Sequence, residues 1–324
     1  RRRHTRFALV SGLGDVYKRQ TIGLGENARV NLNVYYLPTG AKMEIPVYVF
    51  RAKKKGPSVL FMAGMHGDET NGIEIMRNLL KEKHLENLER GSVVAIPITN
   101  VVSFLNRSRD LPDGRDLNRC FPGTRSGSLG SRIAYDLTKK ILPIIDFGVD
   151  FHTGGAEINN YPQVRCFFDN EKSFDLARSF GAPFIVNSAY REKSLRKESS
   201  RLGKPILVYE AGESFRFSKV GISEGMNGCL RLMKNLKMLD VSTPKPQSIT
   251  LTGSKWIRAR ISGLFRTSKK FGTYVEKDQI LGVVSSPYAE LERPLIAPVD
   301  GFLIGINNKP VVNEGDALIH IGTE

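Results

Sequence analysis

Two side chains that could hold a metal ion, His66 and Glu69, lie three residues apart in a glycine-flanked stretch, residues 64–72. An apolar run typical of a buried strand precedes the stretch at 57–63, and apolar residues at helical spacing follow it at 73–80. We therefore expect both side chains at a strand-to-helix corner, where an imidazole nitrogen and a carboxylate can point at one ion. The flanking glycines permit such a turn. Taken alone, so short a pattern also fits a solvated polar turn that caps a helix.

Two further candidates stand near the ends of predicted strands. The apolar run 145–151 ends at His152, and the run 205–213 carries Glu210 toward its end. Ligands of open α/β sheets gather at the carboxyl ends of strands, so we expect His152 to be a third metal ligand. Each residue also has a structural interpretation, as a hydrogen-bonded histidine at a strand end or as a glutamate that caps the next loop.

The order of predicted elements indicates an α/β fold, with a mixed sheet flanked by helices. Strands are expected at 30–37, 45–50, 57–63, 92–98, 145–151, 164–168, 183–186 and 205–213. Helices are expected at 73–80, 132–141 and 218–238, with another between 168 and 183. The polar segment 100–130 is long for a connection within a domain, and four interspersed apolar residues favour an ordered, functional loop: Leu105, Leu111, Leu117 and Phe121.

The pattern changes beyond a proline-containing linker. We predict a catalytic domain over 21–240, a linker over 241–252 and a small all-β domain over 253–324, where short β-like runs alternate with glycine turns. Residues 1–20 show neither strand nor helix periodicity. We expect them to be a non-native leader, a cloning or read-through artefact outside the fold.

Composition limits the class of protein. Hydrophobic residues make up 40% of the chain and charged residues 25%, which is ordinary for a globular protein. No apolar run approaches a membrane span and none resembles a signal-peptide core, so we expect a cytoplasmic protein with no membrane partner. The three cysteines, Cys120, Cys166 and Cys229, are too widely spaced to suggest a disulfide framework.

The formal net charge is +15. Residues 1–20 carry six basic residues against Asp15, a net of +5, which leaves +10 for the rest. This excess suits an anionic substrate. The basic residues are dispersed without interleaved aromatics, so we expect no nucleic-acid partner.

Four motifs in order resemble the succinylglutamate desuccinylase/aspartoacylase family, which has the zinc-carboxypeptidase-like fold. They are Gly64-x-His66-Gly-Asp-Glu69, Asp116-Leu-Asn-Arg119, Asp150-Phe-His152-Thr-Gly154 and Glu210-Ala-Gly212. The resemblance runs from about residue 30 to the C-terminus and includes the β-rich tail.

The resemblance implies a role for each matching residue. His66, Glu69 and His152 match the ligands of one zinc ion per chain, and Glu210 matches the catalytic glutamate. Asn118 and Arg119 match the pair that holds the substrate carboxylate, and Arg109 matches the arginine that polarises the scissile carbonyl. Arg107 and Arg115 share the loop with Arg109, and Glu213 is an alternative to Glu210.

Physical chemistry agrees with these roles. Two histidines and one glutamate leave zinc an open position for water, which a nearby carboxylate can deprotonate. Arg119 can pair with both oxygens of a carboxylate through two of its guanidinium nitrogens, and Arg109 can stabilise an oxyanion. Both arginines could instead order the loop by ion pairs with its aspartates. Arg196 is a candidate for a second acidic group of the substrate, or for a surface ion pair with Glu192 or Glu198.

The resulting hypothesis is a zinc-dependent amidohydrolase, a deacylase of small, anionic N-acyl amino acids in which a glutamate general base works with a zinc-activated water. Peptide carboxypeptidase activity on the same fold is an alternative, and a non-catalytic binding protein is another. The chain is a possible homo-oligomer. We expect structural roles for His84 and His320.

Overall fold

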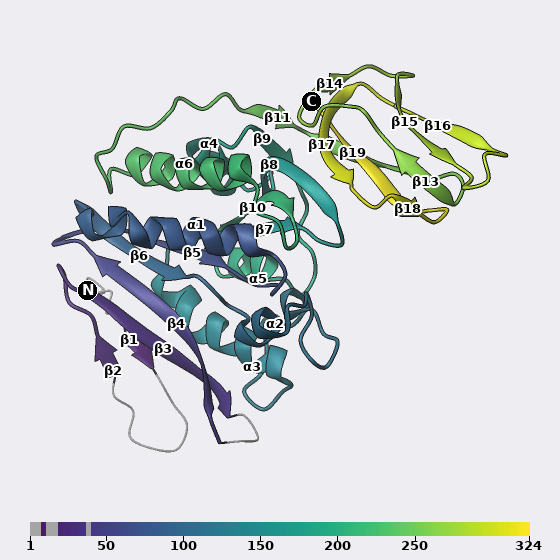
Figure 1. Ribbon diagram of the computed structural model, residues 1–324. Coiled ribbons are helices and arrows are strands. Elements are labelled where there is room, and N and C mark those ends of the chain that lie inside the picture. The colour runs from purple at the N-terminus through teal and green to yellow at the C-terminus, as the bar shows by residue number, and fades with distance from the viewer. Residues whose placement is uncertain (1–7, 11–18, 37–39) are drawn as a thin grey trace.

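The computed structural model describes residues 8–10, 19–36 and 40–324 (Figure 1). Most of the predicted leader, residues 1–7 and 11–18, lies outside the described residues. Strands β1 (Ala8–Val10) and β2 (Arg19–Thr21) pair in antiparallel fashion. Residues 1–20 show no strand periodicity in the sequence, because three-residue strands are too short to show alternation. A non-native origin of residues 1–20 stays a prediction.

Eight strands form the main part of the sheet. They are β3 (Asn27–Tyr36), β4 (Lys42–Arg51), β5 (Lys54–Ala63), β6 (Arg90–Ile96), β7 (Phe147–Gly154), β8 (Ile158–Cys166), β9 (Phe184–Asn187) and β10 (Ile206–Glu213). Neighbours β6, β5, β7 and β10 run parallel, whereas β3, β4 and β8 join by antiparallel pairing. The parallel strands therefore all present their carboxyl ends at one edge.

Helices cover both faces of this sheet (Figure 1). One face carries α1 (Thr70–Lys81), α4 (Glu171–Phe180) and α6 (Lys219–Asn235), and the other carries α2 (Val101–Asn106), α3 (Leu129–Asp136) and α5 (Leu195–Arg201). Shorter turns are η1 (His84–Asn87), η2 (Leu117–Arg119), η3 (Leu137–Ile141) and η4 (Leu142–Ile144). Each face has its own core of buried apolar side chains.

Local sequence explains where the helices begin. Helices α2 to α6 each follow an Asn or Ser whose side chain accepts a backbone N–H of the first turn, which stabilises the helix start. These residues are Asn100, Ser128, Asn170, Ser194 and Ser218. Helix α5 was not expected from the sequence, because its polar residues show no apolar periodicity.

The polar segment 100–130 is ordered by apolar anchors. Leu111, Leu117 and Phe121 are buried, whereas Leu105 is 63% exposed and contributes nothing to this anchoring. Leu105 does not support the expectation of an ordered loop, because it lies in the short helix α2, in which only Ser103 is buried.

The C-terminal part is built of strands. They are β11 (Ile249–Leu251), β12 (Gly253–Arg258), β13 (Gly263–Arg266), β14 (Tyr274–Val275), β15 (Ile280–Ser285), β16 (Glu292–Ile296), β17 (Gly301–Asn307), β18 (Val311–Val312) and β19 (Ala317–Thr323). No described helix begins after α6. The expected fold class, a mixed sheet flanked by helices with a C-terminal all-β part, is confirmed.

The two parts share one sheet. Ten strands follow the order β12-β19-β17-β8-β10-β7-β5-β6-β4-β3, and the junction is the antiparallel pair of β17 with β8. Strand β11, which falls within the predicted linker, pairs with β9. The domain limits at 240 and 253 stay a prediction. None of the described helices is long and apolar enough to cross a membrane.

Candidate active site

The His66–Glu69 corner connects β5 to α1. Gly64 has a φ of 64°, a left-handed conformation that glycine adopts without strain. Gly67 has a different role, because a Cβ there would lie 2.0 Å from the carbonyl carbon of Ser103 in α2. The two glycines thus give the corner its turn and let α2 pack against it.

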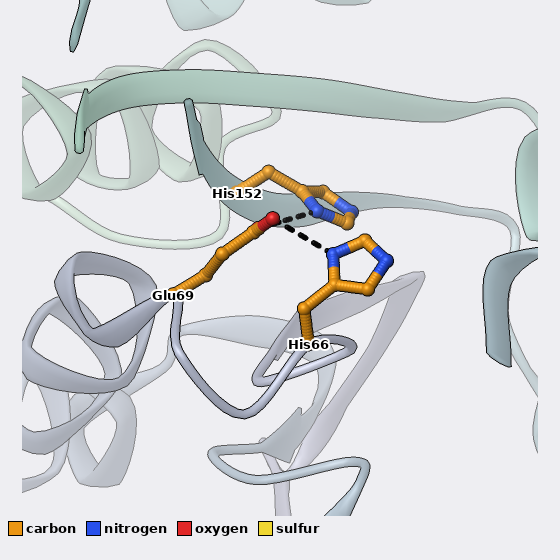
Figure 2. A group of neighbouring side chains, drawn as sticks. All are labelled: His66, Glu69 and His152. Carbon is orange, nitrogen blue, oxygen red and sulfur yellow. Dashed lines mark hydrogen bonds and ion pairs between the residues drawn. The ribbon is translucent and has the colours of Figure 1, made fainter. Parts of the chain in front are cut away.

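Three buried side chains converge at this edge of the sheet (Figure 2). Glu69 Oε1 lies 2.8 Å from His66 Nδ1, and Glu69 Oε2 lies 2.8 Å from His152 Nδ1. One ligand atom from each residue lies within 4.8 Å of the other two. The structure therefore brings together the three residues that the sequence singled out as metal ligands.

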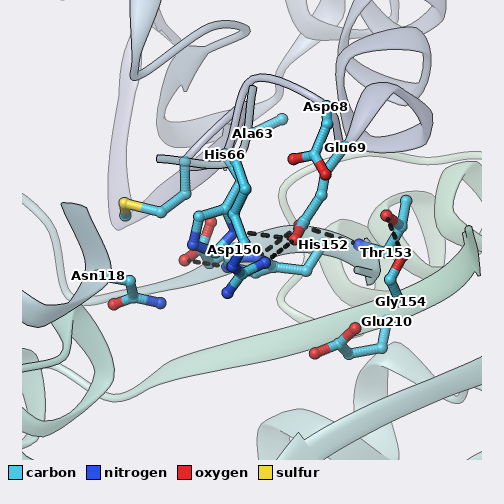
Figure 3. Close-up of polar contacts among 12 residues, drawn as sticks. Ala63, His66, Asp68, Glu69, Asn118, Asp150, His152, Thr153, Gly154 and Glu210 are labelled. Atoms are coloured by element: carbon cyan, nitrogen blue, oxygen red, sulfur yellow. Dashed lines mark hydrogen bonds and ion pairs between the residues drawn. The ribbon is translucent and has the colours of Figure 1, made fainter. Parts of the chain in front are cut away.

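The opposite nitrogen of each imidazole faces an aspartate. His66 Nε2 lies 3.0 Å from Asp116 Oδ1, and His152 Nε2 lies 2.8 Å from Asp150 Oδ2, deep in the cluster of Figure 3. A carboxylate at Nε2 favours the tautomer that carries its proton there and leaves the Nδ1 lone pair free. Both Nδ1 lone pairs then point toward Glu69.

The cluster stabilises positive charge. Burial lowers the pKa of both histidines, but Glu69 with Asp116 and Asp150 outweighs it, so the pKa of His66 is raised and that of His152 is raised further. Burial raises the pKa of Glu69, but the two histidines hold it well below its usual value.

The donor set fits a divalent cation. Buried His66 Nδ1 has no hydrogen-bond partner, although Glu69 Oε1 lies close to it. Three convergent acceptors repel one another unless a proton or a metal ion lies between them. Two histidines and one carboxylate are a set that zinc adopts in catalytic sites.

Glu210 is the Cα register partner of His152 across the parallel pair β10–β7. Its Oε2 accepts a hydrogen bond of 3.0 Å from Asn160 Nδ2, and Arg165 Nη1 lies 3.5 Å from its Oε1. Figure 3 shows Glu210 beside His152 and Gly154. The alternative, Glu213, is buried elsewhere against Asn308 and does not line the same cavity.

One arginine of the 107–115 loop reaches the cluster. Arg109 Nη1 donates to Glu69 Oε1 over 2.7 Å, and its Nη2 lies 3.4 Å from Asp116 Oδ2. Arg107 caps the end of α2, and exposed Arg115 pairs with Asp113. Arg109 therefore forms the expected ion pair with Asp116 in the loop and also contacts the metal-ligand candidate Glu69.

Asn118 and Arg119 lie side by side in η2. Asn118 Oδ1 accepts the N–H of Leu195 over 2.9 Å, and its Nδ2 donates to none of the described residues. Arg119 Nη1 donates to the carbonyl of Asn118, and its guanidinium has no carboxylate partner in the described chain. Both side chains thus keep donors free for a ligand.

All eight predicted site residues line one cavity of about 400 Å³. Sequence reasoning missed Arg165, Arg191 and Trp256, which line it as well. An arginine within a predicted strand was a usable signal for Arg165. Trp256 stands on β12, far along the chain, and no local pattern predicts that it reaches the cavity.

Arg196 is 8% exposed and donates to Ser188 Oγ and the carbonyl of Ala189. The expected alternative, a surface ion pair with Glu192 or Glu198, is wrong because those glutamates pair with Lys197 and Arg201. Burial and then the neighbouring Arg165 lower the pKa of Arg196 to about 10.

Comparison with known proteins agrees with the fold and the motifs. The model of the succinylglutamate desuccinylase/aspartoacylase catalytic domain matches residues 55–236. The N-alpha-acetyl-L-2,4-diaminobutyric acid deacetylase of Halomonas elongata is 26% identical over 298 residues, 86% of this chain and 85% of that protein.

Solved structures show the same fold. The product-bound ectoine utilization protein EutE (DoeB) from Ruegeria pomeroyi has a TM-score of 0.81 at 23% identity, covering 92% of this chain and 95% of that one. A succinylglutamate desuccinylase/aspartoacylase from Rhodobacter sphaeroides has a TM-score of 0.81 at 24% identity, covering 94% and 97%.

The fold and the matched domain are those of amide-hydrolysing deacylases. The chain belongs to the succinylglutamate desuccinylase/aspartoacylase family.

Proposed function

We propose that this protein is a zinc-dependent deacylase that hydrolyses the amide bond of small, anionic N-acyl amino acids. The observation that supports this best is the convergence of His66, Glu69 and His152 in one cavity with Glu210 and Arg119. The Halomonas elongata relative, named for removing an acetyl group from an amino acid, supports the same reaction class.

His66, Glu69 and His152 would hold the zinc ion. Bound there, zinc would supply a Lewis acid that activates water and polarises the amide carbonyl. Asp116 and Asp150 orient the two imidazoles, since each accepts a hydrogen bond at Nε2.

The remaining side chains bind and polarise different parts of the substrate. Asn118 and Arg119 hold the α-carboxylate through their free donors, and the arginine fork matches a carboxylate. Arg109 donates to the carbonyl oxygen as negative charge develops on it, a contribution of about 3–4 kcal/mol for comparable donors.

Glu210 accepts a proton from the attacking water and returns it to the leaving amine nitrogen. Its hydrogen bond from Asn160 orients the carboxylate toward the cavity. Proton transfer by a positioned side chain typically accelerates a reaction by roughly 10²–10⁴.

A second acidic group of the substrate would bind near Arg196. Neither Arg191 nor Arg196 forms an ion pair with a carboxylate in the described chain, and Arg196 Nη1 is buried without a hydrogen-bond partner. An uncompensated buried guanidinium is costly, and an anionic ligand would remove that cost. The pocket can therefore bind a second carboxylate where the substrate carries one.

The test is amine release by zinc-loaded protein from N-acetyl and N-succinyl amino acids, with simple dipeptides alongside. We expect release from acyl amino acids, loss of activity with a chelator, and recovery when zinc is returned. Release from dipeptides alone would indicate a carboxypeptidase. Activity that survives complete removal of metal would contradict the zinc site.

A further inference from the structure

Trp256 is the only tryptophan of the chain, and it lines the cavity from strand β12. Among the described residues around this cavity, it is the only one that follows Glu210 in the sequence and the only Phe, Tyr or Trp. The C-terminal strands, joined to β8 through β17 (Figure 1), thus bring one large aromatic ring to the site.

The ring is held in a fixed orientation. Trp256 and His320 are register partners in the β12–β19 pair, and their rings stack with centroids 4.4 Å apart and planes 7° from parallel. His320 is buried, and burial together with nearby Arg165 lowers its pKa to about 3. The supporting imidazole is therefore neutral at ordinary pH.

Gly305 leaves room for the indole of Trp256, because a side chain there would crowd it. A Cβ on Gly305 would lie 3.4 Å from Trp256 Cη2, 3.2 Å from Asn160 Oδ1 and 3.0 Å from His320 Cβ. Trp256 and Asn160 thus flank the same point of β17, and Asn160 donates directly to Glu210. Asn160 therefore connects the surroundings of the indole to the proposed proton acceptor.

The rest of the cavity wall is mostly polar. Its charged side chains are those of Glu69, Arg109, Arg119, Arg165, Arg191, Arg196 and Glu210. Among the described residues, its only aliphatic side chains larger than alanine are those of Ile158 and Val208, so the wall binds carboxylates but offers few apolar contacts to the carbon chain that connects them. A tryptophan face provides a large, rigid apolar surface, and its N–H forms no hydrogen bond to any described residue.

We propose that Trp256 determines substrate specificity by binding the aliphatic part of the N-acyl amino acid. This inference rests on the proposed deacylase function. The aliphatic part can belong to the acyl group or to the amino-acid side chain, and the experiment distinguishes the two.

The test measures kcat/KM for two substrate series with wild type, Trp256→Ala and Trp256→Phe. One series lengthens the acyl group on glycine from acetyl to propionyl and butyryl. The other lengthens the side chain of an N-acetyl amino acid from alanine to 2-aminobutyrate and norvaline. In the series that reaches the ring, we expect kcat/KM of the wild type to rise about tenfold per methylene.

Trp256→Ala should abolish this rise, and Trp256→Phe should keep most of it because the aromatic face remains. Tyr288→Ala is the matched control, since Tyr288 is a C-terminal aromatic residue that is 82% exposed and outside the cavity wall. It should leave both series unchanged. Equal slopes in wild type and Trp256→Ala for both series would overturn the proposal.

A binding measurement tests the same proposal with Trp256 left in place. In Glu210→Gln, where turnover should stop, N-butyrylglycine or N-acetylnorvaline should shift tryptophan emission saturably, because the only indole lies in the cavity wall. Binding seen by calorimetry without any change in emission would overturn the role of Trp256 and leave the deacylase function intact. Neither binding nor turnover of any N-acyl amino acid would overturn both.

Discussion

Glu210 and His152 are register partners on the parallel strands β10 and β7, so the proposed proton acceptor and a proposed metal ligand stand at the same level of the sheet. Parallel neighbours in register end at one edge, which places their last side chains around a shared space. This pairing links the metal cluster to the part of the cavity in which the substrate amide would lie.

Changing Glu210 to Gln should stop turnover without loss of metal. The amide keeps the size of the carboxylate but cannot accept a proton, and Glu210 is not one of the three convergent ligands. We expect kcat to fall by about 10²–10⁴, with unchanged zinc content by elemental analysis. Glu213→Gln is the matched control and should keep near-normal kcat; a comparable loss there would favour Glu213 as the base.

Changing Asp150 to Asn should weaken metal binding. Asp150 orients His152 through the 2.8 Å contact at Nε2, and loss of such a partner typically lowers metal affinity by about 10–100-fold. The dissociation constant can be measured by competition with a chelating dye. His152→Ala should lose zinc altogether.

Asp175→Asn is the control for this prediction, because Asp175 is exposed and, among the described residues, pairs only with Arg178. Its zinc affinity should equal that of the wild type. Full zinc occupancy in His152→Ala would remove His152 from the ligand set.

Replacing Arg119 with Lys should raise KM more than it lowers kcat. Lysine keeps the charge but loses the planar fork, so the α-carboxylate would be held by fewer hydrogen bonds. We expect KM to rise by about tenfold or more, which corresponds to roughly 1.4 kcal/mol. Arg115→Lys, in the exposed pair with Asp113, should leave KM unchanged. An unaltered KM for Arg119→Lys would contradict the carboxylate clamp.

The folded protein should lose stability in acid through His320. Its pKa falls from an ordinary value of 6.5 to about 3 in the folded state, so the folded state favours the neutral imidazole. The stability is complete above pH 6.5 and declines as pH falls toward 3. Between pH 7.5 and 5 the loss should reach about 2 kcal/mol, with a slope of up to 1.36 kcal/mol per pH unit.

His320→Phe tests this prediction because it keeps a ring against Trp256 but cannot titrate. Denaturant unfolding at pH 7.5 and pH 5 should show a smaller loss of unfolding free energy for this variant than for the wild type. His84→Phe, at a half-buried histidine outside the C-terminal part, should leave the pH dependence as it is in the wild type. Equal losses in His320→Phe and the wild type would show that His320 does not titrate in this range.

Local pattern was sufficient for the α/β class and for most strands and helices. It also predicted that His66, Glu69, His152 and Glu210 lie at the ends of strands, and the structure brings them to one cavity. The physical reason is that strand ends in a parallel sheet must meet at one edge, so polar residues placed there are expected to lie together. Helices α2 and α5 were missed, as were five of the C-terminal strands, because short or polar elements carry little periodic signal. Those strands are β11, β13, β14, β16 and β18.

Sequence did not predict which of several neighbouring arginines lies at the cavity, because that depends on how the loop packs. Among three arginines of one loop, the loop conformation turns Arg109 toward Glu69 and Arg115 toward Asp113. Arg196 is buried where a surface ion pair was equally plausible.

Trp256 joins the cavity because β17 pairs with β8, two strands more than 130 residues apart. Strand pairing over that distance depends on the packing of the whole sheet and not on neighbouring residues. Local sequence thus predicts which side chains could hold a metal ion and bind a substrate, whereas the packing of distant strands sets the shape of the cavity around them.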